Sequence, residues 1–163
     1  MIKSALISPD RLYRYDLLRI WNEDKPAVMF IGLNPSTADE TKDDPTIRRC
    51  IGFARSWGYG QLIMGNLFAL RSTKPAGLLS AADPVGPQND SHLIWLGNQA
   101  SMIVAAWWNG DWIKRVMPNR GKEIIQIFPN IHYLKINNDG VPAHPLYQKK
   151  SIQPIPLNQQ ILF

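Results

Sequence analysis

The sequence switches abruptly from strand-forming to turn-forming residues at Val28-Met29-Phe30-Ile31-Gly32-Leu33-Asn34-Pro35-Ser36-Thr37-Ala38-Asp39. The first four residues have the unbroken apolar character of a buried strand, whereas glycine, asparagine, proline and serine are typical of a turn. Where a parallel strand ends, the backbone leaves the sheet and its side chains face a crevice. We therefore expect a buried strand over Val28–Leu33 and a ligand site directly after it.

Segments typical of strands and helices alternate along the rest of the chain, which predicts an α/β fold. Residues 11–21 alternate partly between apolar and charged side chains, as an edge strand or hairpin beside the main sheet does. We expect further strands at 62–71, 102–107 and 131–136, a helix at 90–99, a short helix or strand at 121–127, a turn at 137–140 and an extended C-terminal segment.

A helix is expected to begin at Asp44-Pro45, because aspartate suits the N-cap and proline suits the first turn. Trp57-Gly58 would end it. Its apolar face would comprise Ile47, Cys50, Ile51 and Ala54.

Length and composition limit the number of domains and the kinds of cofactor and partner that the chain is expected to have. A chain of 163 residues that is 45% hydrophobic can form one good core, so a single domain over residues 1–163 is expected. Its one cysteine, Cys50, excludes an internal disulfide and a cysteine-ligated cluster, so neither a metal nor a cofactor is expected. Without a long apolar run or a leader, the chain is expected to be cytoplasmic and not to bind membranes. A net charge of +5 favours a nucleotide or nucleic acid as partner, and the oligomeric state is left open.

Polar residues follow three of the expected strands. These pairs are Asn34 with Ser36, Asn66 with Arg71, and His144 with Tyr147. Right-handed crossovers between parallel strands would bring all three turns to the same edge of the sheet. We therefore expect the three turns to surround one site, although more than a hundred positions separate the first from the last.

Several motifs resemble those of a bacterial and phage protein family of unknown function, and the match covers nearly the whole chain. The motifs are Asn34-Pro35-Ser36-Thr37-Ala38-Asp39, Asp43-Asp44-Pro45-Thr46-Ile47-Arg48-Arg49-Cys50, Asn66-Leu67-Phe68-Ala69-Leu70-Arg71, Asp83-Pro84-Val85-Gly86-Pro87 with Asn89-Asp90, and His144-Pro145-Leu146-Tyr147.

That family is in turn distantly similar to the uracil-DNA glycosylase superfamily, which implies a three-layer α/β/α sandwich around a short, mainly parallel sheet. Gly32-Leu33-Asn34-Pro35 is similar to the first glycosylase motif, in which asparagine positions the attacking water. Asn66 is similar to the asparagine that reads the base edge, and His144-Pro145 to the motif that contacts the base oxygen and phosphate. The residues after His144-Pro145 depart from the serine-containing pattern that opens duplex DNA.

The resemblance implies hydrolysis of the N-glycosidic bond of a nucleobase in DNA or in a nucleotide. Because this reaction leaves negative charge on the departing base, a donor such as His144 would stabilise it, while Asn34 would orient water. Asn66 carries both a donor and an acceptor, which suits a base edge. The expected substrate-binding residues are Gly32, Leu33, Pro35, Ser36, Asn66, Arg71 and Tyr147, and the expected phosphate-binding residues are Arg48, Arg49 and Lys149.

Each of these residues also has a structural interpretation: Asn34 as a turn cap, Asn66 as a partner of loop backbone, and His144 as a satisfied structural histidine. Two other site chemistries fit poorly. Asp39, Asp43 and Asp44 lack the spacing of a standard cation-binding loop. Ser36, His144 and Asp39 lack the glycine-flanked elbow of a hydrolase triad.

Two alternatives to a glycosylase-like enzyme are open. The first is a non-catalytic module that binds a nucleotide or modified base, which the missing catalytic carboxylate favours. The second is a small-molecule hydrolase that uses the same crevice.

Overall fold

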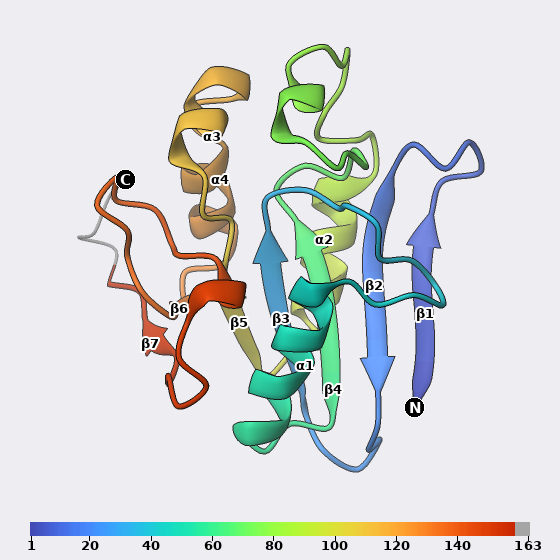
Figure 1. Ribbon diagram of the computed structural model, residues 1–163, viewed down its shortest axis with the longest axis vertical. Helices are drawn as coiled ribbons and strands as arrows, with labels where there is room; N and C mark the ends of the chain where they lie inside the picture. Colours follow the sequence, from blue (N-terminus) through green and yellow to red (C-terminus); the bar gives the residue numbers. More distant parts are fainter. Residues whose placement is uncertain (159–163) are drawn as a thin grey trace.

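The computed structural model describes residues 1–158, and a seven-stranded sheet runs through them (Figure 1). The spatial order of the strands is β1-β2-β4-β3-β5-β6-β7. Their bounds are β1 (Ile2–Ile7), β2 (Arg14–Ile20), β3 (Ala27–Gly32), β4 (Gln61–Asn66), β5 (Met102–Ala105), β6 (His132–Tyr133) and β7 (Ile155–Pro156). The expected α/β class is confirmed.

The sheet is mixed, so the expectation of a mainly parallel sheet is wrong. β3 pairs in parallel with β4 and β5, and β5 pairs in parallel with β6. The pairs β1–β2, β2–β4 and β6–β7 are antiparallel. The chain between β1 and β2 is a short turn without a helix, and only antiparallel strands can be joined in that way. The predicted strand within residues 11–21 is β2, which forms a hairpin with β1 and leaves β1 at the edge.

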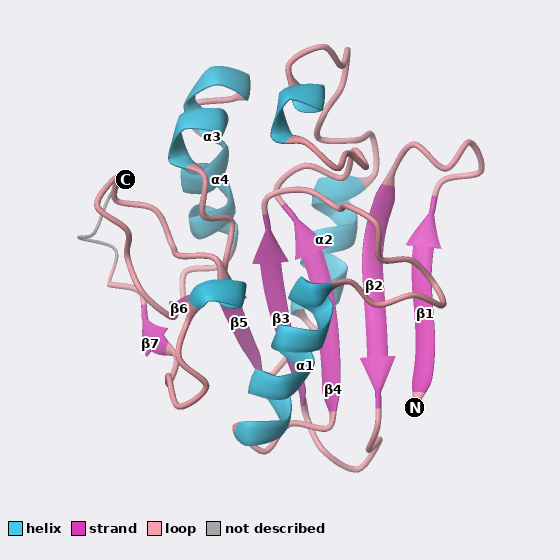
Figure 2. Cartoon of the chain, viewed as in Figure 1, coloured by secondary structure: helices cyan, strands magenta, loops and turns pink. Residues whose placement is uncertain are grey.

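Helices cover both faces of the sheet (Figure 2). Their bounds are α1 (Pro45–Ser56), α2 (Asn89–Gly97), α3 (Gly110–Val116) and α4 (Arg120–Ile127), with short 3-10 turns η1 (Pro75–Leu78) and η2 (Pro145–Tyr147). Successive residues of β3 point to opposite faces, so Val28 and Phe30 pack with α1, whereas Met29 and Ile31 pack with the other helices. The central strands are therefore buried on both sides.

Helix α1 begins as expected. The Asp44 carboxylate accepts a hydrogen bond from the Ile47 amide at 2.9 Å, and Pro45 occupies the first turn. Ile47, Cys50 and Ala54 are buried as expected, but Phe53 takes the place assigned to Ile51 in the core. The apolar face thus fastens α1 to the sheet and fixes Asp44 at its amino end.

Some elements are shorter than predicted. The strand expected at 131–136 is only the two-residue β6. Ile136 instead pairs with Pro142 across the expected turn, in which Gly140 has a φ of 84°. The segment 121–127 is helical, as α4, while α3 had no prediction. The extended C-terminal segment supplies β7. Within residues 1–158, no helix is long and apolar enough to cross a membrane.

Candidate functional site at the strand ends

A cavity of about 150 Å³ opens where β3, β4 and β5 end. The arrowheads of β3 and β4 point the same way, so the loops that follow them lie at the same edge of the sheet (Figure 1). The structure brings six of the predicted site residues to this cavity: Gly32, Leu33, Asn34, Ser36, Asn66 and His144. It also brings several polar or aromatic residues that had no predicted role there, namely Arg14, Asp44, Thr46, Ser72, Thr73 and Trp108.

The other predicted site residues do not line this cavity. They are Pro35, Arg48, Arg49, Arg71, Tyr147 and Lys149. Arg71 donates to the Arg11 carbonyl at 3.3 Å, and Tyr147 is 77% exposed. Arg48 and Arg49 line a separate hollow with Lys150.

Arg49 instead joins α1 to the segment that carries His144. Its guanidinium donates to the Gln148 carbonyl and lies over the Phe53 ring, 5.1 Å from the ring centroid. At the C-cap of α1, about two helical turns after Arg49, the Trp57 indole donates to the Ile152 carbonyl at 3.1 Å. These contacts hold residues 144–152 against α1.

The two polar groups of the Asn34 side chain have different roles. Its Nδ2 donates to the carbonyls of Pro35 and Ser72, each at 2.9 Å, and so ties the loop after β3 to the loop after β4. The amide nitrogen is therefore committed to the backbone. The side-chain oxygen is the group that Asn34 can offer to a ligand or a water, as an acceptor.

Asn66 lies directly across from Gly32 in the parallel pair β3–β4. A Cβ at Gly32 would come within 2.9 Å of Asn66 Nδ2, so glycine makes room for the asparagine side chain. Asn66 Oδ1 accepts from Arg14 Nη2 at 3.3 Å. Because the oxygen is used by Arg14, the Asn66 NH2 group is the part that can donate to a ligand.

Arg14 places a cation at the floor of the cavity. Arg14 is only 3% exposed. Its guanidinium donates to the Ala38 carbonyl at 2.9 Å and to the Asn66 side-chain oxygen. Burial lowers the pKa of Arg14 to about 10, against the opposing effect of the Asp44 charge. No carboxylate within residues 1–158 pairs with Arg14 at ion-pair distance. The cavity is therefore built around a buried positive charge that no side-chain carboxylate of residues 1–158 neutralises at ion-pair distance.

His144 is held as a neutral hydrogen-bond donor. Its Nδ1 accepts from the Leu146 amide at 3.1 Å, so the neutral ring carries its proton on Nε2. Burial lowers the pKa of His144, although the Asp44 charge raises it in part. The ring packs edge-on against Trp108, whose φ of 48° places its own backbone in the left-handed region. A bulky residue with this φ is strained and persists only where its surroundings hold it.

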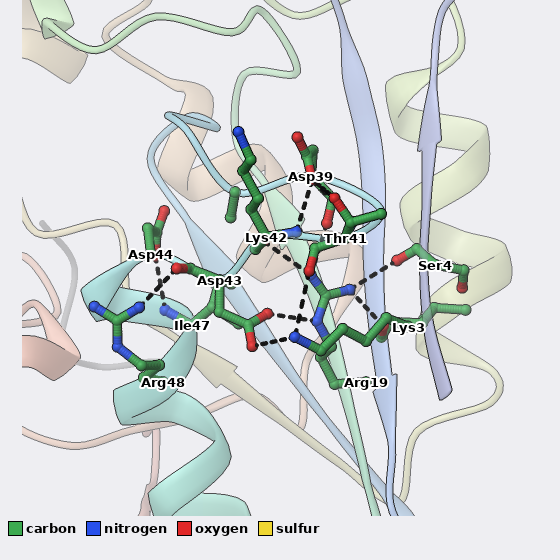
Figure 3. A network of polar contacts seen from close by, with 12 residues as sticks. Lys3, Ser4, Arg19, Asp39, Thr41, Lys42, Asp43, Asp44, Ile47 and Arg48 are labelled. Carbon is green, nitrogen blue, oxygen red and sulfur yellow. Dashed lines mark hydrogen bonds and ion pairs between the residues drawn. The ribbon is translucent and has the colours of Figure 1, made fainter. Parts of the chain in front are cut away.

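The segment 39–44 is held by Arg19, which is fully buried (Figure 3). The Arg19 guanidinium pairs with Asp43 at 2.6 Å. It also donates to backbone carbonyls on both sides, including Ser4 at 3.2 Å and Asp39 at 2.6 Å. Lys3 completes the network by binding the second oxygen of Asp43 at 2.8 Å. Arg19 thus fastens the segment that leads into α1 to the first two strands.

Two of the three aspartates in this segment are committed to structure. Hydrogen bonds from the backbone amides of Thr41 and Lys42 lower the pKa of Asp39 to about 2. Burial alone would raise the pKa of Asp43, but the bonds from Lys3 and Arg19 hold it below its usual value. No group of metal-ligating side chains is found in the described part of the chain. Since Asp39 is bound within its own turn and does not line the cavity, the structure does not assemble the triad with Ser36 and His144.

The fold and the site define an α/β protein with a small polar cavity at the carboxyl ends of its parallel strands. The chain belongs to the DUF1643 family, described as a protein of unknown function, whose family model matches residues 14–146. No curated protein and no solved structure shows significant similarity to the chain. The predicted membership of an uncharacterised family is thus confirmed, and the relationship to glycosylases stays a prediction.

Replacing Arg19 tests the network of Figure 3. Arg19→Met removes one partner of a buried ion pair, so we expect the free energy of unfolding to fall by about 3–5 kcal/mol in urea denaturation. Arg11→Met is the matched control, because it removes an exposed ion pair with Glu40 and should have a much smaller effect. Equal losses in the two variants would contradict the assigned role of Arg19.

Replacing Gly32 tests the approach of Asn66 to β3. In Gly32→Ala the new methyl group would crowd Asn66 Nδ2 and Met64 Cε, so we expect a loss of about 1–3 kcal/mol in unfolding free energy. Gly52→Ala is the control, since a Cβ there meets nothing within 4 Å and the helix should gain slightly. If Gly32→Ala is as stable as Gly52→Ala, the close packing is wrong.

The protonation of His144 predicts a pH dependence of stability. Because burial lowers its pKa in the folded state, the contribution of His144 is fully present above the ordinary value of 6.5 and is lost as the pH falls through the folded pKa. We therefore expect wild type to lose more unfolding free energy than His144→Asn between about pH 7 and pH 5. Urea denaturation at both pH values measures the difference, and parallel losses would argue against a buried neutral ring.

Proposed function

We propose that this protein hydrolyses the N-glycosidic bond of a nucleobase, in DNA or in a nucleotide, with a fold and site that resemble the uracil-DNA glycosylase superfamily. The observation that carries the proposal is that Asn34, Asn66 and His144, which follow different strands, line the same cavity as the buried Arg14. A planar base presents donors and acceptors around its edge. The cavity offers acceptors from Asn34 and Asp44 and donors from the other three residues.

The arrangement suits a reaction in which the leaving group becomes an anion. When the glycosidic bond breaks, its electron pair stays with the base, and donors aimed at the base oxygens stabilise that charge. His144 Nε2 and Asn66 Nδ2 are neutral donors, while Arg14 supplies full positive charge. Donors that folding has already positioned cost little reorganisation during the reaction.

The size of the cavity favours a small ligand or a small part of a larger one. Its volume of about 150 Å³ is below the range of roughly 300–1,000 Å³ that is usual for pockets holding drug-sized molecules. A single base that enters from a strand or a nucleotide would occupy the cavity while its sugar and phosphate stay outside. The exposed cations Arg48, Lys149 and Lys150 are the candidates to bind those phosphates.

A non-catalytic base-binding module is the second candidate. The commitment of Asn34 Nδ2 to the Pro35 and Ser72 carbonyls favours it, because an asparagine used in this way has a structural reason to be present without catalysis. A small-molecule hydrolase would use the same cavity with a different substrate.

Base release distinguishes these functions. Uracil- and hypoxanthine-containing oligonucleotides, single-stranded and duplex, are incubated with the protein and scored for abasic sites, while deoxyuridine monophosphate is scored for free base. We expect His144→Ala and Asn34→Ala to slow base release by roughly 10²–10³-fold. His132→Ala and Asn98→Ala are matched controls outside the cavity.

Binding of these probes without base release would refute the enzyme and favour the binding module. The absence of both binding and release with every probe would refute the nucleobase proposal and leave the small-molecule hydrolase.

A further inference from the structure

The two edge strands of the sheet, β1 and β7, differ in how open they are to a further strand. β7 has only two residues, one of which is Pro156, and a short edge strand with a proline offers little to pair with. β1 has six residues and no proline, and no strand within residues 1–158 pairs with its outer side (Figure 2). β1 therefore presents backbone N–H and C=O groups with which another strand can pair.

The one charged side chain of β1 does not protect this edge. A lysine on an edge strand commonly repels a second strand. Lys3, however, is bonded to Asp43 Oδ2 at 2.8 Å and to the Thr41 carbonyl at 3.3 Å (Figure 3). Its charge is thus balanced within its own chain, and the side chain is drawn toward the segment that precedes α1.

Two apolar side chains of β1 are exposed on the face of the sheet that carries α2. Leu6 lies opposite Asp16 in the β1–β2 pair, and directly opposed residues of antiparallel strands project to the same face. Asp16 Oδ2 lies 2.6 Å from His92 Nε2 of α2, which identifies that face. Ile2 shares it with Leu6, because side chains alternate along a strand. Ile2 is 53% and Leu6 is 44% exposed, so this edge of the sheet carries an exposed apolar strip.

Trp95 of α2 borders this strip. It follows His92 by three positions, so both lie on the same side of the helix, and their rings stack with centroids 5.2 Å apart. Since His92 reaches Asp16 on β2, this side of α2 is directed toward β2 and β1 and not toward β3. Trp95 is 54% exposed and adds a large apolar surface beside β1.

We propose that a second copy of this chain covers this edge, with the two β1 strands paired antiparallel about a two-fold axis that passes beside Ser4. A register irregularity after Leu6 ends the regular part of β1, which leaves residues 2–6 with Ser4 at the centre. A two-fold contact requires a surface that is complementary to itself. The strand meets that requirement in this register.

The cross-strand pairs of this register are favourable on both faces. Ile2 of each copy lies opposite Leu6 of the other, which brings the exposed apolar side chains together. Lys3 lies opposite Ala5 of the other copy, so the two lysines do not face each other. A register centred on Lys3 would place the like charges directly opposite and is disfavoured.

The pairing joins the two seven-stranded sheets into one. Because its two-fold axis is perpendicular to the sheet, both α2 helices stand on the same side, with a Trp95 on either side of the seam. β1 runs parallel to β3 and β4, so the cavities of the two copies open at opposite ends of the joined sheet. Dimerisation therefore leaves both cavities accessible, and the proposal does not depend on the reaction that they perform.

The small size of the contact predicts a dimer that forms only at micromolar concentration. Standard interfaces bury about 800 Å² on each partner. One strand and three partly exposed side chains supply less, so we expect a dissociation constant on the order of 10 μM.

Sedimentation velocity from about 1 to 300 μM tests the dimer, and we expect wild type to shift from monomer to dimer over this range. Ser4 is exposed, so Ser4→Lys and Ser4→Asp should fold normally, as circular dichroism will check. Each places like charges at the axis and should weaken association roughly tenfold or more. An equimolar mixture of the two variants should restore dimerisation, because opposite charges then meet. Ser151→Lys, which changes an exposed serine outside β1 and α2, is the matched control.

Two further variants test the seam without adding charge. Ser4→Cys should form an intermolecular disulfide under mild oxidation much faster than Ser151→Cys, and the buried Cys50 gives little background. Trp95→Ala should weaken association roughly tenfold through the loss of the flanking ring.

A wild-type protein that stays monomeric up to about 300 μM would overturn the proposal and leave β1 for an extended segment of a different protein. A dimer that Ser4→Lys does not weaken, or that the mixture of charge variants does not restore, would also overturn it, because the copies would then meet through another surface.

Discussion

The in-register ending of β3 and β4 is the constraint on which the site depends. Gly32 and Asn66 are partners in the parallel pair, and the absence of a side chain on the first leaves room for the amide of the second. The loop after β4 is then fixed by Asn89 and Arg120, which donate to the Leu67 carbonyl at 3.2 and 2.9 Å. Two neighbouring loops therefore leave the sheet at the same level and enclose a space between them.

The electrostatics of the cavity follow from burial. Arg14 is kept from water and bonded only to neutral oxygens, so its charge is screened little. The same burial keeps His144 neutral and makes it a donor rather than a second cation. Asp44 supplies the opposite charge from the start of α1. The cavity therefore combines a buried guanidinium, a neutral imidazole and a carboxylate.

Local signals were sufficient to predict the strand ends and α1. The change in composition after Ile31 located the end of β3, and the capping chemistry of Asp44-Pro45 located the helix. The place of Asp44 in the cavity was not predicted, because helix capping was already a sufficient reason for an aspartate at this position. Asn34 and Asn66 meet at the cavity because β3 and β4 are adjacent and parallel, whereas His144 reaches it from the start of η2, well after β6.

Non-local features could not be predicted from local patterns. Arg14 has the alternating context of an exposed strand residue, and only the later segments that cover β2 bury it. Arg48 and Arg49 follow the cap closely in sequence, but helical rotation of about 100° per residue turns them away from the cavity and into a separate hollow. The direction of β2 and β7 depends on pairing with distant strands, which composition does not encode.

The bonds from Arg49 and Trp57 to residues 148 and 152 give α1 a mechanical role. One end of the helix carries Asp44, and its side clamps the chain that carries His144. Asp44 and the segment that carries His144 are therefore both fixed to the same helix, which sets the spacing between the carboxylate and the imidazole. Evolution of a new specificity could therefore reshape the loops after β3 and β4 while this spacing stays constant.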